Sequence, residues 1–181
     1  MEIVLCISGS IAAYKSAEIV RCFRRKKADV TCVLTPAARH FVTPLTLSTL
    51  TGRPVPQDMF AEPLWNMAHL SLTEKADAIL MAPASADLLA KLAHGLADDL
   101  PSTLALAASQ PVFIAPAMHE GMWLHPATQA NVGLCKGYGY RFIGPARGEM
   151  ASGVVGMGRL EEPALIVDAV LSALKTSRKK R

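Results

Sequence analysis

The sequence predicts a single α/β domain built on a mostly parallel, doubly wound sheet. Short apolar runs bounded by turn residues are typical of strands that are buried on both faces. Such runs lie at residues 3–7, 30–34, 78–82 and 112–115, with a weaker one at 140–143. Helical patterns separate the runs, and strands that alternate with helices form parallel sheets. With 181 residues, 51% of them hydrophobic, the chain can bury a sizeable core.

The segment between the first two runs has the pattern of an amphipathic helix. Ile19, Val20 and Phe23 fall on one helical face, while the lysines, arginines and glutamate of the same segment can face water. Further helices are expected near residues 37–50, 86–96 and 102–108. This order of elements predicts a flavodoxin-like or Rossmann-like three-layer sandwich with helices on both sides of the sheet.

Three segments do not fit the strand and helix pattern. They are the proline-rich segment 52–71, the segment 116–128 and the glycine-rich segment 144–163. Loops that leave the carboxyl ends of parallel strands are where such folds bind ligands, so we expect these segments to shape a site. Without an internal repeat or a linker, residues 1–175 are expected to form one domain, followed by a basic, disordered tail at 176–181.

Composition and charge exclude several classes of protein. No apolar run reaches the roughly 18 residues of a membrane-spanning helix, and the N-terminus lacks a cleavable signal pattern, so we expect a cytoplasmic protein without membrane contact. The net charge of +4 comes partly from the terminal basic run, which is too short to indicate nucleic-acid binding. The four cysteines lack metal-ligand spacing and are interpreted as buried free thiols.

The turn after the first predicted strand is a candidate phosphate site. In Ser8-Gly9-Ser10-Ile11, small residues join a buried strand to a helix, so backbone N–H groups at the helix start can point outward. The hydroxyls of Ser8 and Ser10 can donate further hydrogen bonds to an anion. A plain strand-to-helix turn with Ser10 as the N-cap explains the same residues. The turn matches neither the dinucleotide fingerprint nor the P-loop, so a mononucleotide is the better ligand.

Five motifs together resemble a known family. They are Gly9-Ser10-Ile11-Ala12-Ala13-Tyr14-Lys15, His69-Leu70-Ser71-Leu72, Pro83-Ala84-Ser85-Ala86-Asp87, Pro116-Ala117-Met118 followed by Met122-Trp123, and Gly158-Arg159-Leu160-Glu161-Glu162-Pro163. In this order and spacing they resemble the flavin-dependent cysteine decarboxylases, and within these the phosphopantothenoylcysteine decarboxylases of coenzyme A synthesis. The resemblance extends over the chain to about residue 169 and implies an FMN-binding fold.

The resemblance also implies roles for individual residues. The cofactor candidates are Gly9, Ser10, Ile11, Thr35, Ser85 and Ala117, and Ser85 is also a candidate helix N-cap. His69 matches the family's acid/base residue, a role that suits an imidazole. The substrate-binding candidates are His119, Met122, Ala151 and Ser152. Lys15 could neutralise a phosphate, or it could be a solvated lysine on the helix face.

Two of these positions depart from the family pattern. His119 replaces an asparagine thought to hold the substrate carboxylate, and an imidazole can still donate one hydrogen bond. Ser152 replaces the cysteine that protonates an ene-thiolate, and a hydroxyl is a far weaker acid than a thiol. Cys135 is left open as a thiol that the fold could bring close. We predict no metal site, because the spacing of His119 and His125 places them on different helical faces.

The resemblance implies FMN-dependent decarboxylation of a cysteine carboxylate, in phosphopantothenoylcysteine or at a peptide C-terminus. Flavin oxidation to a thioaldehyde would provide an electron sink for loss of CO2, and the reaction could stop at the ene-thiol. The alternatives are an FMN-binding protein without decarboxylase activity and, less well matched, a flavin prenyltransferase. The family further implies a homo-oligomer, either a trimer or a dodecamer built from trimers.

Overall fold

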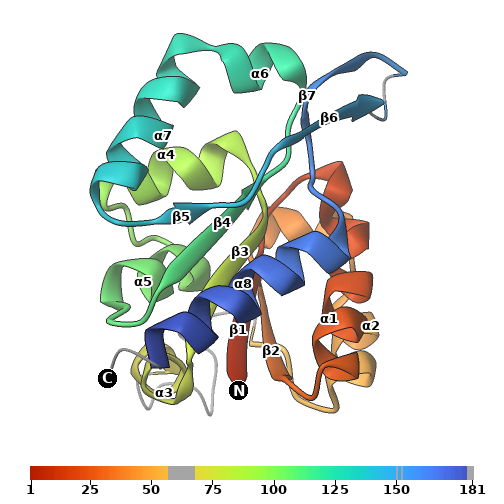
Figure 1. Ribbon diagram of the computed structural model, residues 1–181, viewed down its shortest axis with the longest axis vertical. Helices are drawn as coiled ribbons and strands as arrows, with labels where there is room; N and C mark the ends of the chain where they lie inside the picture. Colours follow the sequence, from red (N-terminus) through yellow and green to blue (C-terminus); the bar gives the residue numbers. More distant parts are fainter. Residues whose placement is uncertain (57–67, 150, 152, 179–181) are drawn as a thin grey trace.

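The protein forms a five-stranded parallel sheet with helices on both faces (Figure 1). The computed structural model describes residues 1–56, 68–149, 151 and 153–178. The strand order is β2-β1-β3-β4-β5, and each neighbouring pair is parallel. The strands are β1 (Glu2–Ile7), β2 (Asp29–Leu34), β3 (Ala78–Ala84), β4 (Val112–Pro116) and β5 (Arg141–Phe142). The predicted class of fold is therefore confirmed, and the strand order is that of flavodoxin-like proteins.

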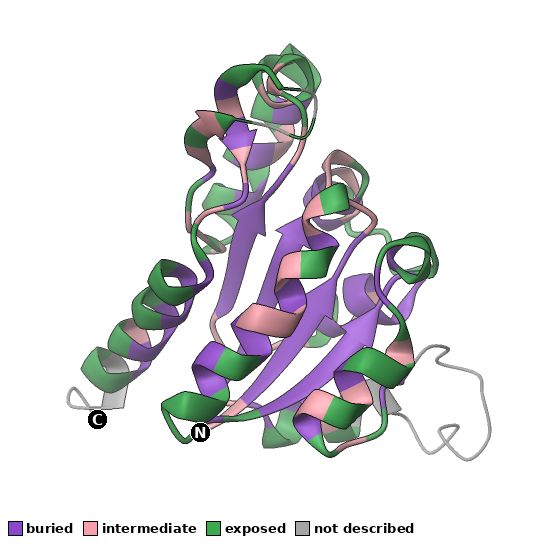
Figure 2. Cartoon of the chain, turned by 90° about the vertical axis from the view of Figure 1, so that its right-hand side faces the viewer, coloured by how far each residue is buried: buried purple, intermediate pink, exposed green. Residues whose placement is uncertain are grey.

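The helices form the two outer layers of the molecule. Helices α1 (Ser16–Arg25), α2 (Pro44–Thr51) and α8 (Pro163–Arg178) contribute buried side chains to the core on one face of the sheet. The core on the other face is packed by α3 (Ala68–Lys75), α4 (Ala86–His94), α5 (Leu100–Ala107) and α7 (Pro126–Gly137). Figure 2 shows the sheet almost entirely buried between helices whose outer faces are exposed.

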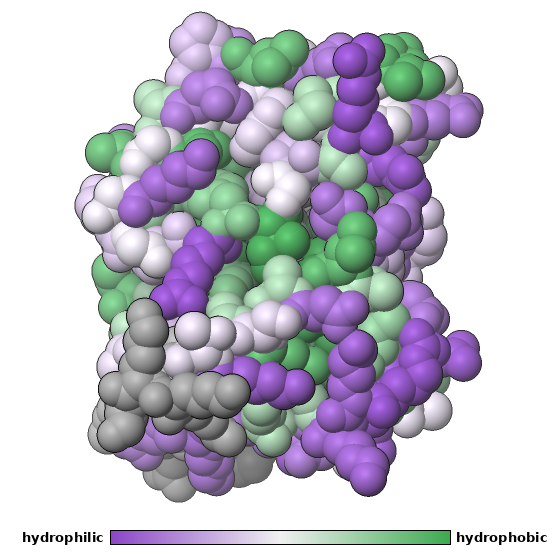
Figure 3. Space-filling model, viewed as in Figure 1, coloured by the Kyte–Doolittle hydropathy of each residue, from purple (hydrophilic) through white to green (hydrophobic). Residues whose placement is uncertain are grey.

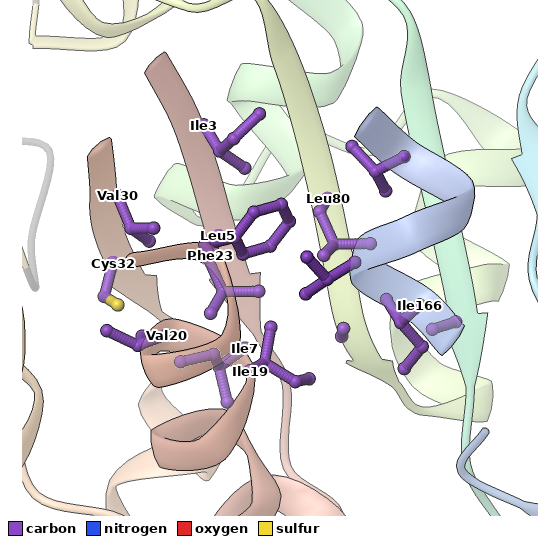
Figure 4. Packing of buried hydrophobic residues seen from close by; sticks show 14 of the residues in the cluster. Ile3, Leu5, Ile7, Ile19, Val20, Phe23, Val30, Cys32, Leu80 and Ile166 are labelled. Carbon is purple, nitrogen blue, oxygen red and sulfur yellow. The ribbon is translucent and has the colours of Figure 1, made fainter. Parts of the chain in front are cut away.

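The apolar runs of the sequence account for these two cores. Alternate residues of a strand point to opposite faces, so Ile3, Leu5 and Ile7 of β1 enter one core while Val4 and Cys6 enter the other. Figure 4 shows Phe23 of α1 and Ile166 of α8 packed with the strand side chains of the first core. All of these side chains are at most 1% exposed, so the central strands lie in a dry interior.

The remaining elements gather at the end of the sheet where the strands stop. Two short 3-10 helices, η1 (Ile11–Lys15) and η2 (Pro36–His40), follow β1 and β2, and α6 (Glu120–Leu124) follows β4. An antiparallel hairpin of β6 (Ala146–Glu149) and β7 (Val155–Arg159) forms a separate two-stranded sheet beside α6 (Figure 1). The glycine-rich segment 144–163, expected to be irregular, therefore contains this hairpin.

The structure corrects the expected helices in two places. The single helix predicted near 37–50 is divided into η2 and α2, because Pro44 lacks an N–H group and holds Thr43 in an extended conformation that caps α2. Helices α7 and α8 were not predicted, and α8 continues to Arg178. Among the described residues, no helix is both long and apolar enough to cross a membrane.

Candidate functional site

A pocket of about 760 Å³ lies at the carboxyl ends of β1, β3 and β4. Eight of the residues predicted for cofactor or substrate line it, which are Gly9, Ser10, Ile11, Ser85, Ala117, His119, Met122 and Ala151. They come from four separate segments of the chain. The fold therefore brings most of the predicted site together, at the edge of the sheet where parallel α/β folds bind ligands.

The turn after β1 presents backbone donors to this pocket. Ser10 is the N-cap of η1, its Oγ accepts a hydrogen bond from the Ala12 N–H, and it donates to the Ala117 carbonyl oxygen at 3.1 Å. Within the described part of the chain, neither the Gly9 N–H nor the Ile11 N–H donates a hydrogen bond. Gly9 also packs against η2, since a Cβ at this position would lie 2.5 Å from the Ala37 Cβ. The turn thus offers two free N–H groups at a helix start, which is the arrangement that binds phosphates.

Ser8 has a different role from the one expected. Its hydroxyl is 1% exposed, donates to the Pro83 carbonyl oxygen and accepts from the Ser85 N–H, both at 2.7 Å. The Ser8 hydroxyl is therefore not available to an anion, because both of its bonds are made inside the protein. Instead it joins the turn after β1 to the loop after β3.

Ser85 and Thr35 both cap helices, but only Ser85 lines the pocket. The Ser85 Oγ accepts from the Leu88 N–H at 3.2 Å as the N-cap of α4, and its hydroxyl proton remains free to donate. The Thr35 Oγ caps η2 by accepting from the Ala38 N–H, and Thr35 is buried behind the turn. Thr35 does not line the pocket, and its contact with the cofactor stays a prediction.

His119 lies in the pocket wall as the N-cap of α6. Its Nδ1 accepts a hydrogen bond from the Gly121 N–H at 3.1 Å, so Nε2 is the ring nitrogen that can donate to a ligand. His125 caps α7 in the same way through the Ala127 N–H. Among the described residues, no group of three or more histidine, cysteine, aspartate or glutamate side chains could hold a metal ion.

The hairpin forms another wall of the pocket. Glu149 at the end of β6, Ala151, and Gly158 and Arg159 of β7 all line the pocket. The predicted substrate residue Ser152 lies outside the described residues.

Two cations lie at the pocket and share one carboxylate. Lys15 Nζ is 3.8 Å from Glu162 Oε1, and Arg159 forms an ion pair with the same oxygen. Lys15 and Arg159 both line the pocket, whereas Glu162 does not. The lining also includes the carboxylate of Glu149, so Lys15 and Arg159 offer cationic groups to an anionic ligand without giving the pocket a net positive charge.

The predicted catalytic residue His69 belongs to the first turn of α3, and its side chain lies outside the described part of the structure. Figure 1 places α3 at the end of the sheet where the strands begin. Hydrogen bonds agree with this placement, because Gln110, just before β4, donates to the Thr73 carbonyl oxygen of α3. Helix α3 and the pocket therefore lie at opposite ends of the sheet.

The cysteines lie away from the pocket. Cys135, left open as a nearby thiol, is fully buried in the core between α4 and α7, and its Sγ lies 3.8 Å from the Leu89 carbonyl oxygen. Burial raises the pKa of the Cys135 thiol to about 11. All four cysteines are buried and none lines the pocket.

The fold and the pocket define an α/β protein of the flavodoxin-like class, with a turn that has two free N–H groups at the carboxyl edge of its sheet. The model of the family described as Flavoprotein matches residues 1–175. The chain belongs to this flavoprotein family.

Relatives of known activity are similar over most of the chain. The coenzyme A biosynthesis bifunctional protein CoaBC of Haemophilus influenzae is 46% identical over 170 residues, which are 93% of this chain and 42% of that protein. CoaBC of Escherichia coli is 43% identical over 173 residues, again 42% of its length. The chain therefore spans about two fifths of the curated relatives that it matches.

Solved structures share both the fold and part of the sequence. A PPC decarboxylase mutant complexed with pantothenoylaminoethenethiol has a TM-score of 0.89 and 32% identity, covering 96% of this chain and 98% of the other. The FMN binding protein AtHal3 has a TM-score of 0.86 and 32% identity, covering 97% of each chain. The peptidyl-cysteine decarboxylase EpiD, at 24% identity and a TM-score of 0.80 over 94% of this chain and 98% of the other, shares the fold.

Proposed function

We propose that this chain binds FMN in the pocket at the carboxyl edge and with it decarboxylates a cysteine carboxylate. The observation that carries the proposal is the pair of free N–H groups on Gly9 and Ile11, two residues that line the pocket together with Lys15 and Arg159. Free amides, a helix start and nearby cations fit the phosphate of a mononucleotide. The names of the relatives, PPC decarboxylase and FMN binding protein, support the same ligand and reaction.

The residues of the turn and of the loop after β3 would hold the cofactor. The N–H groups of Gly9 and Ile11 and the hydroxyl of Ser85 are the donors available to its phosphate. Ser10 and Ala117 would shape the floor, since they are bonded to each other. When bound, FMN supplies hydride acceptance from the thiol-bearing carbon, so that the C=S group can stabilise the charge left by CO2.

Substrate binding is assigned to α6 and the hairpin. The Nε2 of His119 is placed to donate a hydrogen bond to the substrate carboxylate, and Met122, which is 50% exposed, offers an apolar contact. Ala151 faces the same space from the hairpin. Since a serine at position 152 is a weak acid, we expect the ene-thiol product to be released without reduction.

His69 is proposed as the acid/base residue, acting in the pocket of a neighbouring copy. Its helix lies at the far end of the sheet from the pocket of the same chain (Figure 1), so a homo-oligomer is required to bring the two together. The pocket end of the molecule exposes Ile11, Tyr14 and Leu45 by 57%, 61% and 75%, which suits a subunit contact. Figure 3 shows a further group of hydrophobic residues across the middle of one face. A trimer, a dodecamer and a cytoplasmic location remain predictions.

Complementation tests this assignment. A His69→Asn chain and a chain with a disabled pocket should each be inactive and should recover activity when they are assembled together. A mixed oligomer that stays inactive, although its His69→Asn chains still bind FMN, would exclude action between copies.

A second function, FMN binding without decarboxylation, is favoured by two observations. The similar protein AtHal3 is described as an FMN binding protein. In addition, His119 and Ser152 depart from the decarboxylase pattern at the positions assigned to the substrate.

The product mass separates the two functions. Holoprotein is incubated with phosphopantothenoylcysteine and, separately, with a peptide that ends in cysteine. Loss of CO2 together with two hydrogens supports decarboxylation that stops at the ene-thiol. Loss of CO2 alone would overturn the inference from Ser152, and a yellow protein that converts neither substrate would establish FMN binding without decarboxylation.

A further inference from the structure

The hairpin of β6 and β7 forms a wall of the pocket without belonging to the main sheet. Among the described strands, β6 and β7 pair only with each other. A two-stranded hairpin is at best marginally stable by itself, so its position depends on contacts with other elements. Val154 and Val155 near its tip are 48% and 62% exposed and provide little packing.

The contacts that hold the hairpin are concentrated where β7 crosses the start of α6. The Met118 N–H donates to the Gly158 carbonyl oxygen at 2.9 Å. The Glu120 Oε1 accepts from the Met157 N–H at 2.7 Å. Glu120 is the first residue of α6, directly after His119 in the pocket wall, so this bond joins the two walls of the pocket.

Two glycines make this close approach possible. A Cβ at position 156 would lie 2.5 Å from both Cδ and Oε1 of Glu120, and position 156 is buried. A Cβ at position 158 would lie 2.2 Å from the Met118 carbonyl oxygen, and Gly158 has a φ of +127° that other residues rarely adopt. The backbone of β7 is thus fitted to the Glu120 carboxylate on one side and to the strand-to-helix turn on the other.

We propose that Glu120 is a positioning residue that fixes the hairpin wall against α6. A carboxylate that accepts a backbone N–H forms a strong, charge-assisted bond. This bond sets how far Glu149, Ala151 and Arg159 stand from His119 and Met122 across the pocket. Glu120 itself does not line the pocket, so its effect on a ligand passes through the hairpin.

The inference rests on the proposed function for its kinetic readout but not for its structural one. Holoprotein variants Glu120→Ala and Glu120→Gln are compared by amide hydrogen exchange of residues 155–159, by FMN content and by the kcat and KM for phosphopantothenoylcysteine. Glu120→Ala should speed exchange in β7 by about tenfold to a hundredfold, the range expected for one lost hydrogen bond to a charged group. FMN content should stay the same and KM should rise at least about tenfold. Glu120→Gln should bring both the exchange rate of β7 and the KM most of the way back to the wild-type values, because the glutamine amide oxygen can still accept the hydrogen bond from the Met157 N–H.

A double-variant cycle makes the assignment specific. Gly156→Ala should reproduce the effects of Glu120→Ala, because the added methyl group displaces the carboxylate from the Met157 N–H. The double variant should show the same β7 exchange and the same KM as Glu120→Ala alone, because the Glu120 carboxylate that would clash with the methyl group at position 156 is then absent. Gly133→Ala, on α7 with no atom within 4 Å of the added methyl, is the control and should leave β7 exchange unchanged.

The outcomes are distinct. Unchanged β7 exchange in Glu120→Ala, or effects that multiply in the double variant, would overturn the proposal. Loss of FMN together with faster exchange would also overturn it, since Glu120 would then support the whole pocket. If wild-type holoprotein converts no cysteine carboxylate, the proposed function fails while the exchange measurements still decide the role of Glu120.

Discussion

At the residue scale, the site depends on hydroxyl groups that bond to backbone far away in the sequence. The Ser8 hydroxyl joins Pro83 and Ser85, which are 75 and 77 residues away, and the Ser10 hydroxyl joins Ala117, 107 residues away. The sequence predicted the turn, the cap at Ser10 and eight of the residues that line the pocket. The sequence could not predict that the Ser8 hydroxyl bonds within the protein instead of to a ligand, because Pro83 and Ser85 become its neighbours only in the folded chain.

Replacing Ser8 tests this bridge. Ser8→Ala leaves the partly buried N–H of Ser85 without a partner and should lower the free energy of unfolding by about 1–3 kcal/mol. It should also weaken FMN binding, because the turn and the loop after β3 lose their link. Thermal unfolding and FMN titration measure the two effects. Ser48→Ala, which removes a partly exposed hydroxyl on α2, is the control and should change stability by no more than about 0.5 kcal/mol. If Ser8→Ala and Ser48→Ala had the same unfolding free energy and the same FMN affinity, the Ser8 bonds would contribute to neither.

At the element scale, the strands were more predictable than the helices. A strand buried on both faces leaves a continuous apolar run, as in β1 and β3, so its position is clear from the sequence. The break between η2 and α2 depends on Pro44 and on the cap of Thr43, which a helical pattern does not reveal. Helix α7 was missed because only Thr128, Val132 and Cys135 among its residues are buried, too few for a distinct apolar face.

Two glycine substitutions distinguish helix propensity from backbone conformation. Gly133 lies inside α7 and Gly95 caps α4 with a φ of +68°, and neither has an atom within 4 Å of an added Cβ. Gly133→Ala should stabilise the protein by about 0.5–1 kcal/mol, since glycine is a poor helix former. Gly95→Ala should destabilise it by about 1 kcal/mol, since the left-handed conformation strains other residues. Chemical denaturation measures both, and shifts of the same sign would contradict this account.

At the scale of the whole molecule, one domain places five segments around a pocket, whereas the curated CoaBC relatives are longer than this domain. The chain matches 42% of CoaBC from Haemophilus influenzae. The sequence predicted the family and the fold because its motifs lie at the ends of strands, where the fold brings them together. It did not predict the hairpin wall, since glycines in the segment 144–163 are equally compatible with a loop.

Buried thiols in both cores should make the protein sensitive to alkali. Burial raises the pKa of Cys32 to about 12 and that of Cys135 to about 11, from an ordinary value of 9.0. Below pH 9 these thiols are neutral in both states, so their contribution to stability is complete. Above it the unfolded chain releases protons that the folded chain keeps, and stability falls by about 1.4 kcal/mol per pH unit for each thiol.

A single substitution measures this linkage. Cys32→Val should reduce the loss of unfolding free energy between pH 9 and pH 11 by about 1.4 kcal/mol per pH unit. Denaturant unfolding at several pH values gives the slopes for both proteins. An identical slope in the variant would mean that Cys32 titrates in the folded protein as it does in the unfolded chain.

The central claim is that the turn Gly9-Ser10-Ile11 holds the phosphate of FMN. Calorimetric titration of flavin-free protein with FMN and with riboflavin, which lacks the phosphate, tests it most directly. Because the bonds to a phosphate are charge-assisted, FMN should bind at least about a hundredfold more tightly than riboflavin. Equal affinity for the two flavins, or no binding of FMN, would contradict the claim.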